Sequence, residues 1–255
     1  MTSHNNNTTR FSNRVDDYVK YRPGYPAAML RFLQENYNLD STKIIADIGS
    51  GTGISSAYFL EAGYQVMGVE PNPEMREKSV ELLQHFPLFK AVDGTAETTT
   101  LNSDSVDVII SGQAFHWFDV VKAKEEFKRI LRPDSLLILF WNERLQSSDF
   151  EKEYDALIVK HAIDYVKVDH RRIDWDSIET FYTPHQVELK EFPNYQVFDF
   201  EGLKGRLLSS SYMPQKGDKG YDAMVADLKQ LYDKYQQHDS ITINYATKIY
   251  IGKLT

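Results

Sequence analysis

Five residues near the start of the chain could bind a ligand that carries a positive charge beside a sugar. Asp47 ends an apolar run, and three alternating glycines follow it, Gly49, Gly51 and Gly53. Glycines after a strand bring backbone N–H groups together and admit no side chains, as in a nucleotide-binding turn. An acid directly before the first glycine repels a pyrophosphate and attracts an ammonium. Glu70 ends the next apolar run, where a carboxylate can accept hydrogen bonds from both hydroxyls of a ribose.

The spacing of the glycines helps to separate two classes of nucleotide ligand. A dinucleotide fold uses G-x-G-x-x-G, with the pyrophosphate on the helix N-terminus. Here Ile54 stands at the last position of that pattern. An ammonium partner at Asp47 and a ribose partner at Glu70 fit S-adenosylmethionine better than NAD. That ligand indicates methyl transfer, an in-line displacement for which a protein must align the acceptor and exclude water.

Strands and helices alternate along the first half of the chain. Short apolar runs alternate with amphipathic segments five times, which predicts βαβ units in a doubly wound sheet. Asn72 and Asp119 are expected to cap helices, with Pro73 at the first position of one of them. The predicted strands are 43–48, 64–70, 88–93, 106–111 and 136–141, and the predicted helices are 27–37, 54–62, 73–85 and 120–131.

The second half of the chain has longer helical segments. We expect residues 1–10 to be a disordered tail and residues 11–255 to form a single domain. Within it, 27–145 bind the ligand, 146–237 form a helical cap for the substrate, and 238–255 supply the terminal strand. The predicted helices here are 150–168, 201–213 and 222–237, the predicted strands are 195–200 and an antiparallel 240–251, and a charged stretch of weak periodicity spans 167–190.

Several motifs together resemble those of the class I S-adenosylmethionine-dependent methyltransferases. They are D-I-G-S-G-T-G, G-V-E-P-N-P-E-M, G-T-A-E at 94–97, S-G-Q-A-F-H-W-F-D at 111–119 and R-I-L-R-P-D-S-L-L-I-L at 129–139. Another group is similar to a small-molecule subgroup that includes trans-aconitate methyltransferase-like proteins. It comprises A-F-H-W-F-D, F-W-N-E-R, Y-x-x-Y-R-P-G-Y-P, S-S-S-Y-M-P and the closing I-T-I-N-Y-A-T-K-I-Y-I-G.

The resemblance implies an α/β fold with a doubly wound, Rossmann-like seven-stranded sheet, an antiparallel last strand and a helical cap from the second half. It implies S-adenosylmethionine as cofactor and S-adenosylhomocysteine as product. In the family, the acid of the second motif binds the ribose and the residues after it flank the adenine. The cofactor-binding residues so implied are Asp47, Gly49, Ser50, Gly51, Gly53, Glu70, Pro71, Met75, Thr95, Ala96, Glu97, Ser111, Gln113 and Arg22.

Two positions depart from the family pattern. Thr95 stands where the adenine-edge loop often carries an acid, so the backbone at Ala96 is expected to take over recognition of the adenine amino group. The common R-P-G-G turn is R-P-D-S here. Asp134 can adopt a left-handed conformation at modest cost, so this change is expected to affect stability more than function.

Three residues are candidates for the catalytic step. His116 could act as a general base, polarise a substrate carboxylate or cap the methyl pocket, and a packing role is at least as good an interpretation. Tyr21, together with Tyr18 and Arg22, is of a type that a lid would use, although packing explains that stretch equally well. Tyr212 could reach the acceptor or belong to a helix cap. A carboxylate acceptor would need no base, whereas a phenol or amine would need one.

Composition narrows the class of protein. The chain has 255 residues with 29 basic against 37 acidic side chains, a net charge of −8, which disfavours nucleic acid and anionic membranes as partners. It has no cysteine and no run of apolar residues long enough for a bilayer, and its histidines lack ligand spacing, so we expect a cytoplasmic protein without a metal. Its expected partner is a small-molecule acceptor, and the sequence does not distinguish a monomer from a homodimer.

Two other functions compete with methyl transfer to a small molecule, with O-methylation of a carboxylate as its favoured form. The first is a non-catalytic or regulatory protein that binds S-adenosylmethionine through the same fold. The second is a nicotinamide oxidoreductase, against which Asp47 argues. Saturable binding of S-adenosylmethionine would exclude the nicotinamide oxidoreductase. Turnover with any acceptor would then distinguish a methyltransferase from the non-catalytic protein.

Overall fold

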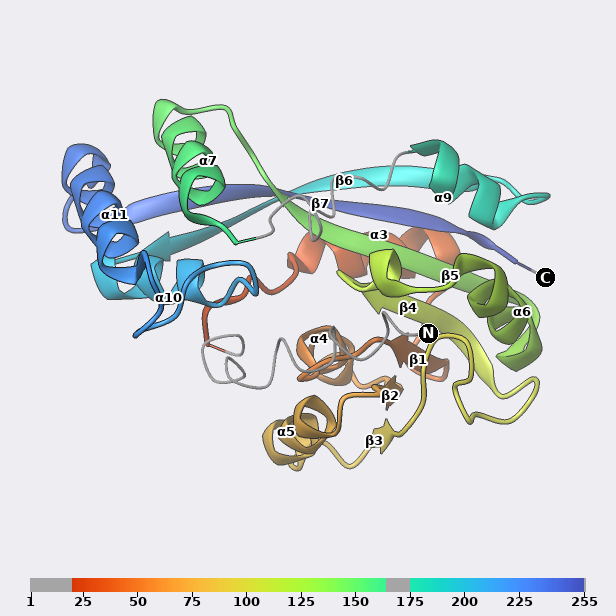
Figure 1. The fold of residues 1–255 in the computed structure, drawn as a ribbon. Helices are drawn as coiled ribbons and strands as arrows, with labels where there is room; N and C mark the ends of the chain where they lie inside the picture. Colours follow the sequence, from red (N-terminus) through yellow and green to blue (C-terminus); the bar gives the residue numbers. More distant parts are fainter. Residues whose placement is uncertain (1–19, 164–174, 255) are drawn as a thin grey trace.

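The computed structural model describes residues 20–163 and 175–254, which contain one seven-stranded sheet with helices on both faces (Figure 1). The strands are β1 (Ile44–Ile48), β2 (Gln65–Val69), β3 (Phe89–Val92), β4 (Val106–Gly112), β5 (Leu131–Arg144), β6 (Val187–Phe198) and β7 (Ile241–Lys253). Their order is β3–β2–β1–β4–β5–β7–β6. The first five pair in parallel, and β7 runs antiparallel to both β5 and β6. The predicted doubly wound sheet with an antiparallel last strand is confirmed.

The helices begin where the sequence places polar caps. The Asn72 side chain accepts a hydrogen bond from the Met75 N–H at 3.1 Å, and Asp119 accepts one from Lys122 at 3.3 Å. Both contacts satisfy backbone donors that a helix start leaves without partners. The helices are α3 (Ala27–Tyr37), α4 (Ile54–Leu60), α5 (Pro73–Leu83), α6 (Val120–Ile130), α7 (Asp149–His161), α9 (Trp175–Tyr182), α10 (Phe200–Leu208) and α11 (Tyr221–Tyr235), and a short 3-10 helix spans Phe115–Trp117.

Each face of the sheet has its own apolar core. On one face, α3, α4 and α5 cover alternate residues of β4 such as Val108 and Ile110. On the other face, α6 and α9 cover Ile109 and the residues beside it. Successive side chains of a strand point to opposite faces, so a strand buried on both sides must be apolar throughout. This requirement explains why the central strands read as continuous apolar runs rather than as alternating ones.

A helical cap stands beyond the carboxyl end of β5. The helices α7, α10 and α11 gather at one end of the sheet, at the left of Figure 1, against the extended ends of β6 and β7. Their shared core includes Tyr154, Leu203 and Leu228, together with Ile243 and Tyr245 of β7. Because parallel strands deliver their functional residues at their carboxyl ends, the cap lies on the side of the sheet where a ligand would bind.

The structure corrects several predicted boundaries in the second half. The helix expected over 150–168 ends at His161, because Ala162 already has an extended conformation. The strand expected at 195–200 is β6, which begins at Val187 inside the charged stretch. As an edge strand it pairs only with β7 and exposes much of its length, so it needs no apolar face to mark it in the sequence. The helix expected to reach residue 213 ends at Leu208.

Asp134 of the R-P-D-S turn adopts the left-handed conformation that the sequence analysis allowed for it. Asp134 has a φ of 61°, in the left-handed region, and its carboxylate forms an ion pair with Lys253 at 2.9 Å. The turn lies within the first part of β5, which begins at Leu131 rather than at 136. The expected tail at 1–10 and the residue Tyr18 lie outside the described residues.

Candidate active site

The three glycines of the turn after β1 serve two different purposes. All three have positive φ, 71° at Gly49, 57° at Gly51 and 89° at Gly53. A Cβ at Gly49 would lie 2.6 Å from the Cβ of Ala114, and one at Gly53 would lie 2.6 Å from Leu83 Cδ1. Those two glycines permit close packing. Among the described residues, a Cβ at Gly51 would come within 4 Å only of the Met75 sulfur, at 3.9 Å, so close packing is not the reason for a glycine here.

The N–H groups of this turn are directed into the protein. Those of Gly49 and Ser50 donate to the Val69 carbonyl at 2.9 and 3.2 Å, and that of Gly53 donates to the Ser50 carbonyl at 2.9 Å. The Gly51 N–H donates to Glu70 Oε2 at 2.9 Å. A pyrophosphate needs several N–H groups that point at it. These four N–H groups are therefore not directed at a ligand, which agrees with the choice between ligands made from Asp47.

Asp47 is a fully buried carboxyl group with one satisfied oxygen. Its Oδ2 accepts hydrogen bonds from the hydroxyls of Ser55 and Ser56 at 2.6 and 2.7 Å, both in the first turn of α4. Its Oδ1 is buried and accepts no hydrogen bond. Burial raises the pKa of Asp47 to about 6, against the opposing effect of the two serines. A buried acceptor without a donor is costly, and an ammonium from a ligand would supply the donor and the compensating charge.

Glu70 connects the tip of β2 to the glycine turn. It is 7% exposed, and its Oε2 and Oε1 accept hydrogen bonds from the N–H groups of Gly51 and Asn72, the second at 2.8 Å. Burial raises its pKa above the ordinary value. Each carboxylate oxygen has a second lone pair, so the pair of ribose hydroxyls can still be accepted while the N–H groups hold the carboxylate in place.

The other expected cofactor residues fall at the neighbouring strand ends. Met75 is buried beside Gly51, whereas Pro71 is exposed. Thr95 is exposed and Ala96 is buried, and Glu97 accepts a hydrogen bond from the Asp119 N–H at 2.8 Å. Glu97 therefore ties the expected adenine-edge loop to the start of α6.

At the tip of β4, the polar side chains hold the backbone together. The Ser111 hydroxyl donates to the Ile48 carbonyl at 3.0 Å. Gln113 has a φ of 61°, and its side-chain amide donates to the Asn142 carbonyl at 3.4 Å. His116 lies in the short 3-10 helix with its ring against Trp117, at 4.5 Å between centroids. The structure thus places His116 at the end of β4, where the sequence predicted it, and leaves its role a prediction.

Arg22 and the two tyrosine candidates lie toward the cap. The Arg22 guanidinium donates to the Ser209 carbonyl at 3.1 Å, just after α10. The Tyr21 ring packs on Gly205 of α10, where a Cβ would lie 2.1 Å from its Cε2. Tyr212 lies beyond α10, close enough to Arg22 to feel its charge. The structure therefore brings Arg22, Tyr21 and Tyr212 together beside α10, and their predicted roles at the cofactor and the acceptor stay predictions.

Two asparagines that the sequence analysis did not single out hold this arrangement. The Asn142 amide donates to the Gly24 carbonyl at 3.1 Å, and Asn194 donates to the same carbonyl at 2.9 Å and to Asn142 Oδ1 at 3.1 Å. Asn142 is buried within the apolar strand β5. The available signal was an asparagine directly after the apolar run L-L-I-L-F-W, because an amide that is buried with such a strand needs hydrogen-bond partners.

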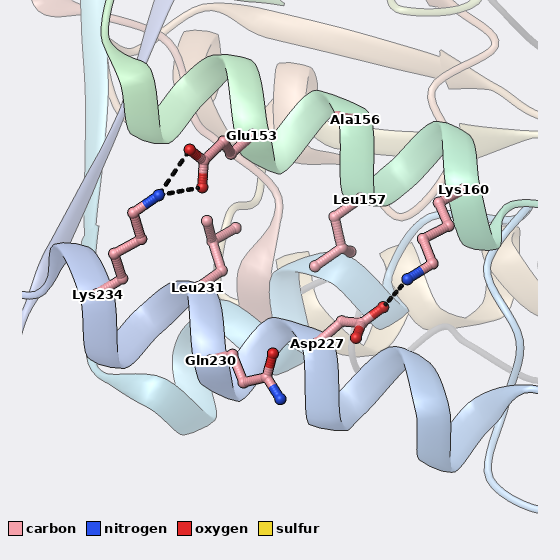
Figure 2. Close-up of a pocket in the computed structure, with 8 residues that line it drawn as sticks. All are labelled: Glu153, Ala156, Leu157, Lys160, Asp227, Gln230, Leu231 and Lys234. Carbon is pink, nitrogen blue, oxygen red and sulfur yellow. Dashed lines mark hydrogen bonds and ion pairs between the residues drawn. The ribbon is translucent and has the colours of Figure 1, made fainter.

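A hollow of about 350 Å³ lies between α7 and α11 of the cap (Figure 2). Its charges are matched within the protein: Lys234 pairs with Glu153 at 2.8 Å and Lys160 with Asp227 at 2.7 Å. Leu157 and Leu231 lie between the two pairs in Figure 2. These contacts join the two helices and offer no group suited to methyl transfer.

The described residues contain neither a metal-binding cluster nor a membrane-spanning helix. Within residues 20–163 and 175–254, no cluster of histidine and acidic side chains could hold a metal ion. In the same ranges, no helix has both the length and the apolar character needed to cross a membrane.

Comparisons with known proteins place this site in a family. A family model described as a methyltransferase domain matches residues 46–139. An uncharacterised methyltransferase-like protein of Schizosaccharomyces pombe is 26% identical over 93% of this chain and 92% of its own. An uncharacterised methyltransferase of Mycobacterium bovis is 34% identical over 58% of each chain. A solved structure from Anaeromyxobacter dehalogenans, described as a type II methyltransferase, superposes on this chain with a TM-score of 0.68 at 21% sequence identity. The match covers 92% of this chain and 98% of the other.

These matches confirm the family inferred from the motifs and leave the trans-aconitate-like subgroup a prediction. They span the segment from Ala46 to Leu139, which contains the glycine turn, Glu70 and the tip of β4. The cofactor of this family is S-adenosylmethionine, and the Asp47 Oδ1 that accepts no hydrogen bond is an acceptor that its ammonium would need. The chain therefore contains a methyltransferase domain and has the fold of the class I S-adenosylmethionine-dependent methyltransferases.

Proposed function

We propose that this protein transfers a methyl group from S-adenosylmethionine to a carboxylate of a small molecule. The observation that carries the cofactor half of the proposal is the buried Asp47 oxygen that accepts no hydrogen bond. The relatives and the family model support methyl transfer in general, and none of them favours the non-catalytic alternative. The acceptor half is supported by the cap and by the segment that joins the cap to the cofactor site.

The protein's own groups would orient the cofactor at three points. Asp47 would accept from the amino-acid ammonium, and Glu70 would accept from the ribose hydroxyls. Met75 would lie against the adenine, near the backbone of Ala96. S-adenosylmethionine supplies a methyl group on a sulfonium, which is a good leaving group. With these three contacts fixed, the remaining task of the protein is to hold the acceptor in line with the sulfur and to keep water out.

A bridging segment, Lys20–Tyr25, limits the space for the acceptor. At one end a Cβ at Gly112 of β4 would lie 2.6 Å from the Tyr25 hydroxyl, so Tyr25 sits against the strand tip. At the other end Tyr21 and Arg22 contact α10 and Ser209. The segment thus runs from the tip of the sheet to the cap. An acceptor held between them must be small, and a nucleic acid or folded protein would have to displace the segment.

A carboxylate acceptor would need no general base, and His116 is the one candidate for such a base at the tip of β4. A carboxylate is already a nucleophile near neutral pH, so transfer to it requires alignment and no proton acceptor. His116 can then orient the acceptor by a hydrogen bond. If the acceptor were a phenol or an amine, His116 would have to remove a proton, and its replacement would abolish turnover.

Calorimetry tests the cofactor half. We expect S-adenosylmethionine to bind the wild type, and Asp47→Asn and Glu70→Gln each to weaken binding by roughly 10- to 150-fold, the equivalent of a charge-assisted hydrogen bond of about 1.5–3 kcal/mol. Glu35→Gln, which changes an exposed acid on α3, is the matched control and should bind like the wild type. Absence of saturable binding, or equal binding by all four proteins, would refute this half.

Product chemistry tests the acceptor half. The protein is incubated with S-adenosylmethionine labelled in its methyl group and with a fractionated extract of small metabolites. A methyl ester releases labelled methanol on mild alkaline hydrolysis, whereas a methyl ether or methylamine does not. Label that resists alkali would contradict the carboxylate assignment while leaving methyl transfer intact.

A further inference from the structure

The two helices that border the hollow in the cap carry the same pattern of side chains. On α7 the pattern is acid-x-x-Ala-Leu-x-x-Lys, from Glu153 to Lys160, and on α11 it is acid-x-x-Gln-Leu-x-x-Lys, from Asp227 to Lys234. Residues at i, i+3, i+4 and i+7 lie on one face of a helix. All of these residues line the hollow, so each helix turns the same face toward it (Figure 2).

The charges of the two patterns alternate in sign around the hollow. The acid of each helix pairs with the lysine of the other, Glu153 with Lys234 at 2.8 Å and Asp227 with Lys160 at 2.7 Å. The two helices are therefore antiparallel, and an approximate two-fold axis through the middle of the hollow relates one pattern to the other. The four charges sum to zero, although the chain as a whole carries −8. This face is thus a neutral patch on an acidic protein.

A square of alternating charges is complementary to itself. When a second copy is turned over by a two-fold axis in the plane of the face, Glu153 meets Lys234 or Lys160 of the other copy, according to whether the axis runs along or across the helices. Asp227 meets the other of these two lysines. Most homodimers have such an axis, and it makes every contact occur twice. Carboxylates and ammonium groups each form several hydrogen bonds, so the contacts within a chain can persist in the dimer.

Exposed apolar residues flank the charges on the solvent side of both helices. Ala156 and Val159 lie three residues apart on α7, and Val159 is 57% exposed. Ala223 and Ala226 are exposed at the same spacing on α11. The helices have 13 and 15 residues, so the face measures roughly 20 Å by 20 Å, about half of the ~800 Å² that each partner buries in a standard interface. A face of this size supports a weak, reversible dimer.

We propose that the α7–α11 face is a self-association surface, on which a second copy of this chain docks through the four alternating charges. The repeated pattern and its self-complementary charges are what favour a copy of the same chain over a different protein. The opposite sides of both helices form the core of the cap, so docking joins the caps of two copies. The glycine turn before α4 lies away from this face in Figure 1, so each copy keeps its own cofactor site and the inference does not depend on the proposed function.

Sedimentation equilibrium of the full chain tests the proposal, over about 1 to 300 μM, the concentrations at which weak complexes form. We expect a monomer–dimer equilibrium in the wild type that weakens at least fivefold when the salt concentration rises from about 0.05 to about 0.5 M. Ala156→Glu places a charge beside the centre of the face and should weaken the dimer at least tenfold. Ala27→Glu makes the same exchange at the exposed first residue of α3 and should leave it unchanged.

A charge exchange gives a second test that keeps the ion pair within the chain. The double variant Glu153→Lys with Lys234→Glu reverses the sign of one pair. Mixed with labelled wild type, it brings like charges together at two of the four contacts for either axis, so the mixed dimer should be at least tenfold weaker than the wild-type dimer. Circular dichroism and the urea midpoint of each variant establish that it is folded.

Two outcomes would overturn the proposal. If the wild type stays monomeric at the highest concentration, the occupant of the face is not a second copy, and a different protein would have to be its partner. If the wild type dimerises but neither Ala156→Glu nor the charge exchange weakens the dimer, the contact lies on another surface. Neither outcome affects binding of S-adenosylmethionine, so the proposed function stands or falls separately.

Discussion

The affinity for S-adenosylmethionine should depend on pH through Asp47. The pKa of this buried carboxyl is raised to about 6 by burial, and an ammonium ligand binds only its charged form. With a pKa of about 6, roughly nine-tenths of the carboxyl is ionised at pH 7 and roughly one-tenth at pH 5. The ligand ammonium, with an ordinary pKa near 8, stays charged over this range. The affinity should therefore fall about tenfold, or by about 1.4 kcal/mol, from pH 7 to pH 5.

The assay compares the wild type with Asp47→Asn by calorimetry between pH 5 and 8. Glu70 also has a raised pKa, but it is present in both proteins, so the ratio of their dissociation constants isolates Asp47. That ratio should shrink about tenfold between pH 7 and pH 5. Near pH 6 the wild type should also release about half a proton on binding, measured from heats in two buffers of different ionisation enthalpy. A ratio that stays constant across the range, with no proton release, would refute the role of Asp47.

The remaining predictions concern the free energy of unfolding and the hydrogen exchange of the backbone in residues 20–25. Because the folded-state pKa of Asp47 is raised from 3.8 to about 6, the wild type should lose about 2.4 kcal/mol of unfolding free energy relative to Asp47→Asn as the pH rises from 4 to 7. Urea titrations that show no such change would contradict this. Gly49→Ala should cost at least about 2 kcal/mol in urea unfolding, since the left-handed φ alone costs about 1–2 kcal/mol and the new Cβ meets Ala114, and an unchanged midpoint would count against the close packing. Burial acts to raise the pKa of Glu151, but hydrogen bonds from Ser148, Asn244 and Ser147 lower it to about 2. Glu151→Gln should therefore lower the free energy of unfolding by roughly 1.5–3 kcal/mol at pH 7, and by progressively less as the pH falls below 4. An equal loss at pH 7 and below pH 4 would exclude the charge of Glu151 as the cause. Asn142→Ala should speed backbone hydrogen exchange in residues 20–25, measured by mass spectrometry, and leave S-adenosylmethionine binding within twofold; unchanged exchange would mean that Asn194 alone holds the segment.

The cofactor half of the molecule was predictable because its signals are local. A strand, a glycine turn and a helix start occupy consecutive residues, so Asp47 and Gly53 lie near each other whatever the rest of the chain does. The left-handed Asp134 was predictable for the same reason, since a turn depends on four residues. The N–H groups of the turn were less predictable, because their acceptors Val69 and Glu70 lie on the next strand.

The cap could not be predicted at the same level because its contacts are distant in sequence. Arg206 lies in a segment that reads as an ordinary amphipathic helix, and its burial depends on Tyr245, which is 39 residues away. Arg22 donates a hydrogen bond to the Ser209 carbonyl, which lies 187 residues along the chain. No periodicity within a window of a helix or strand can reveal such pairs. The strand β6 was missed in part because an exposed edge strand needs no apolar pattern.

The way the cap is attached has a consequence for how acceptor specificity can change. The chain enters the cap after Arg144, at the end of β5, and leaves it through β7, whose far part pairs with β5 along the sheet. At the entrance, Glu151 binds both the start of α7 and Asn244 of β7, so entry and exit are fastened to each other. The cofactor residues at Asp47 and Glu70 precede this junction entirely. Sequence changes confined to α7, α10 and α11 can therefore reshape the cap while the residues around Asp47 and Glu70 stay unaltered, whereas α9 and β6, which lie in the same stretch of chain, belong to the sheet and its core and must be kept.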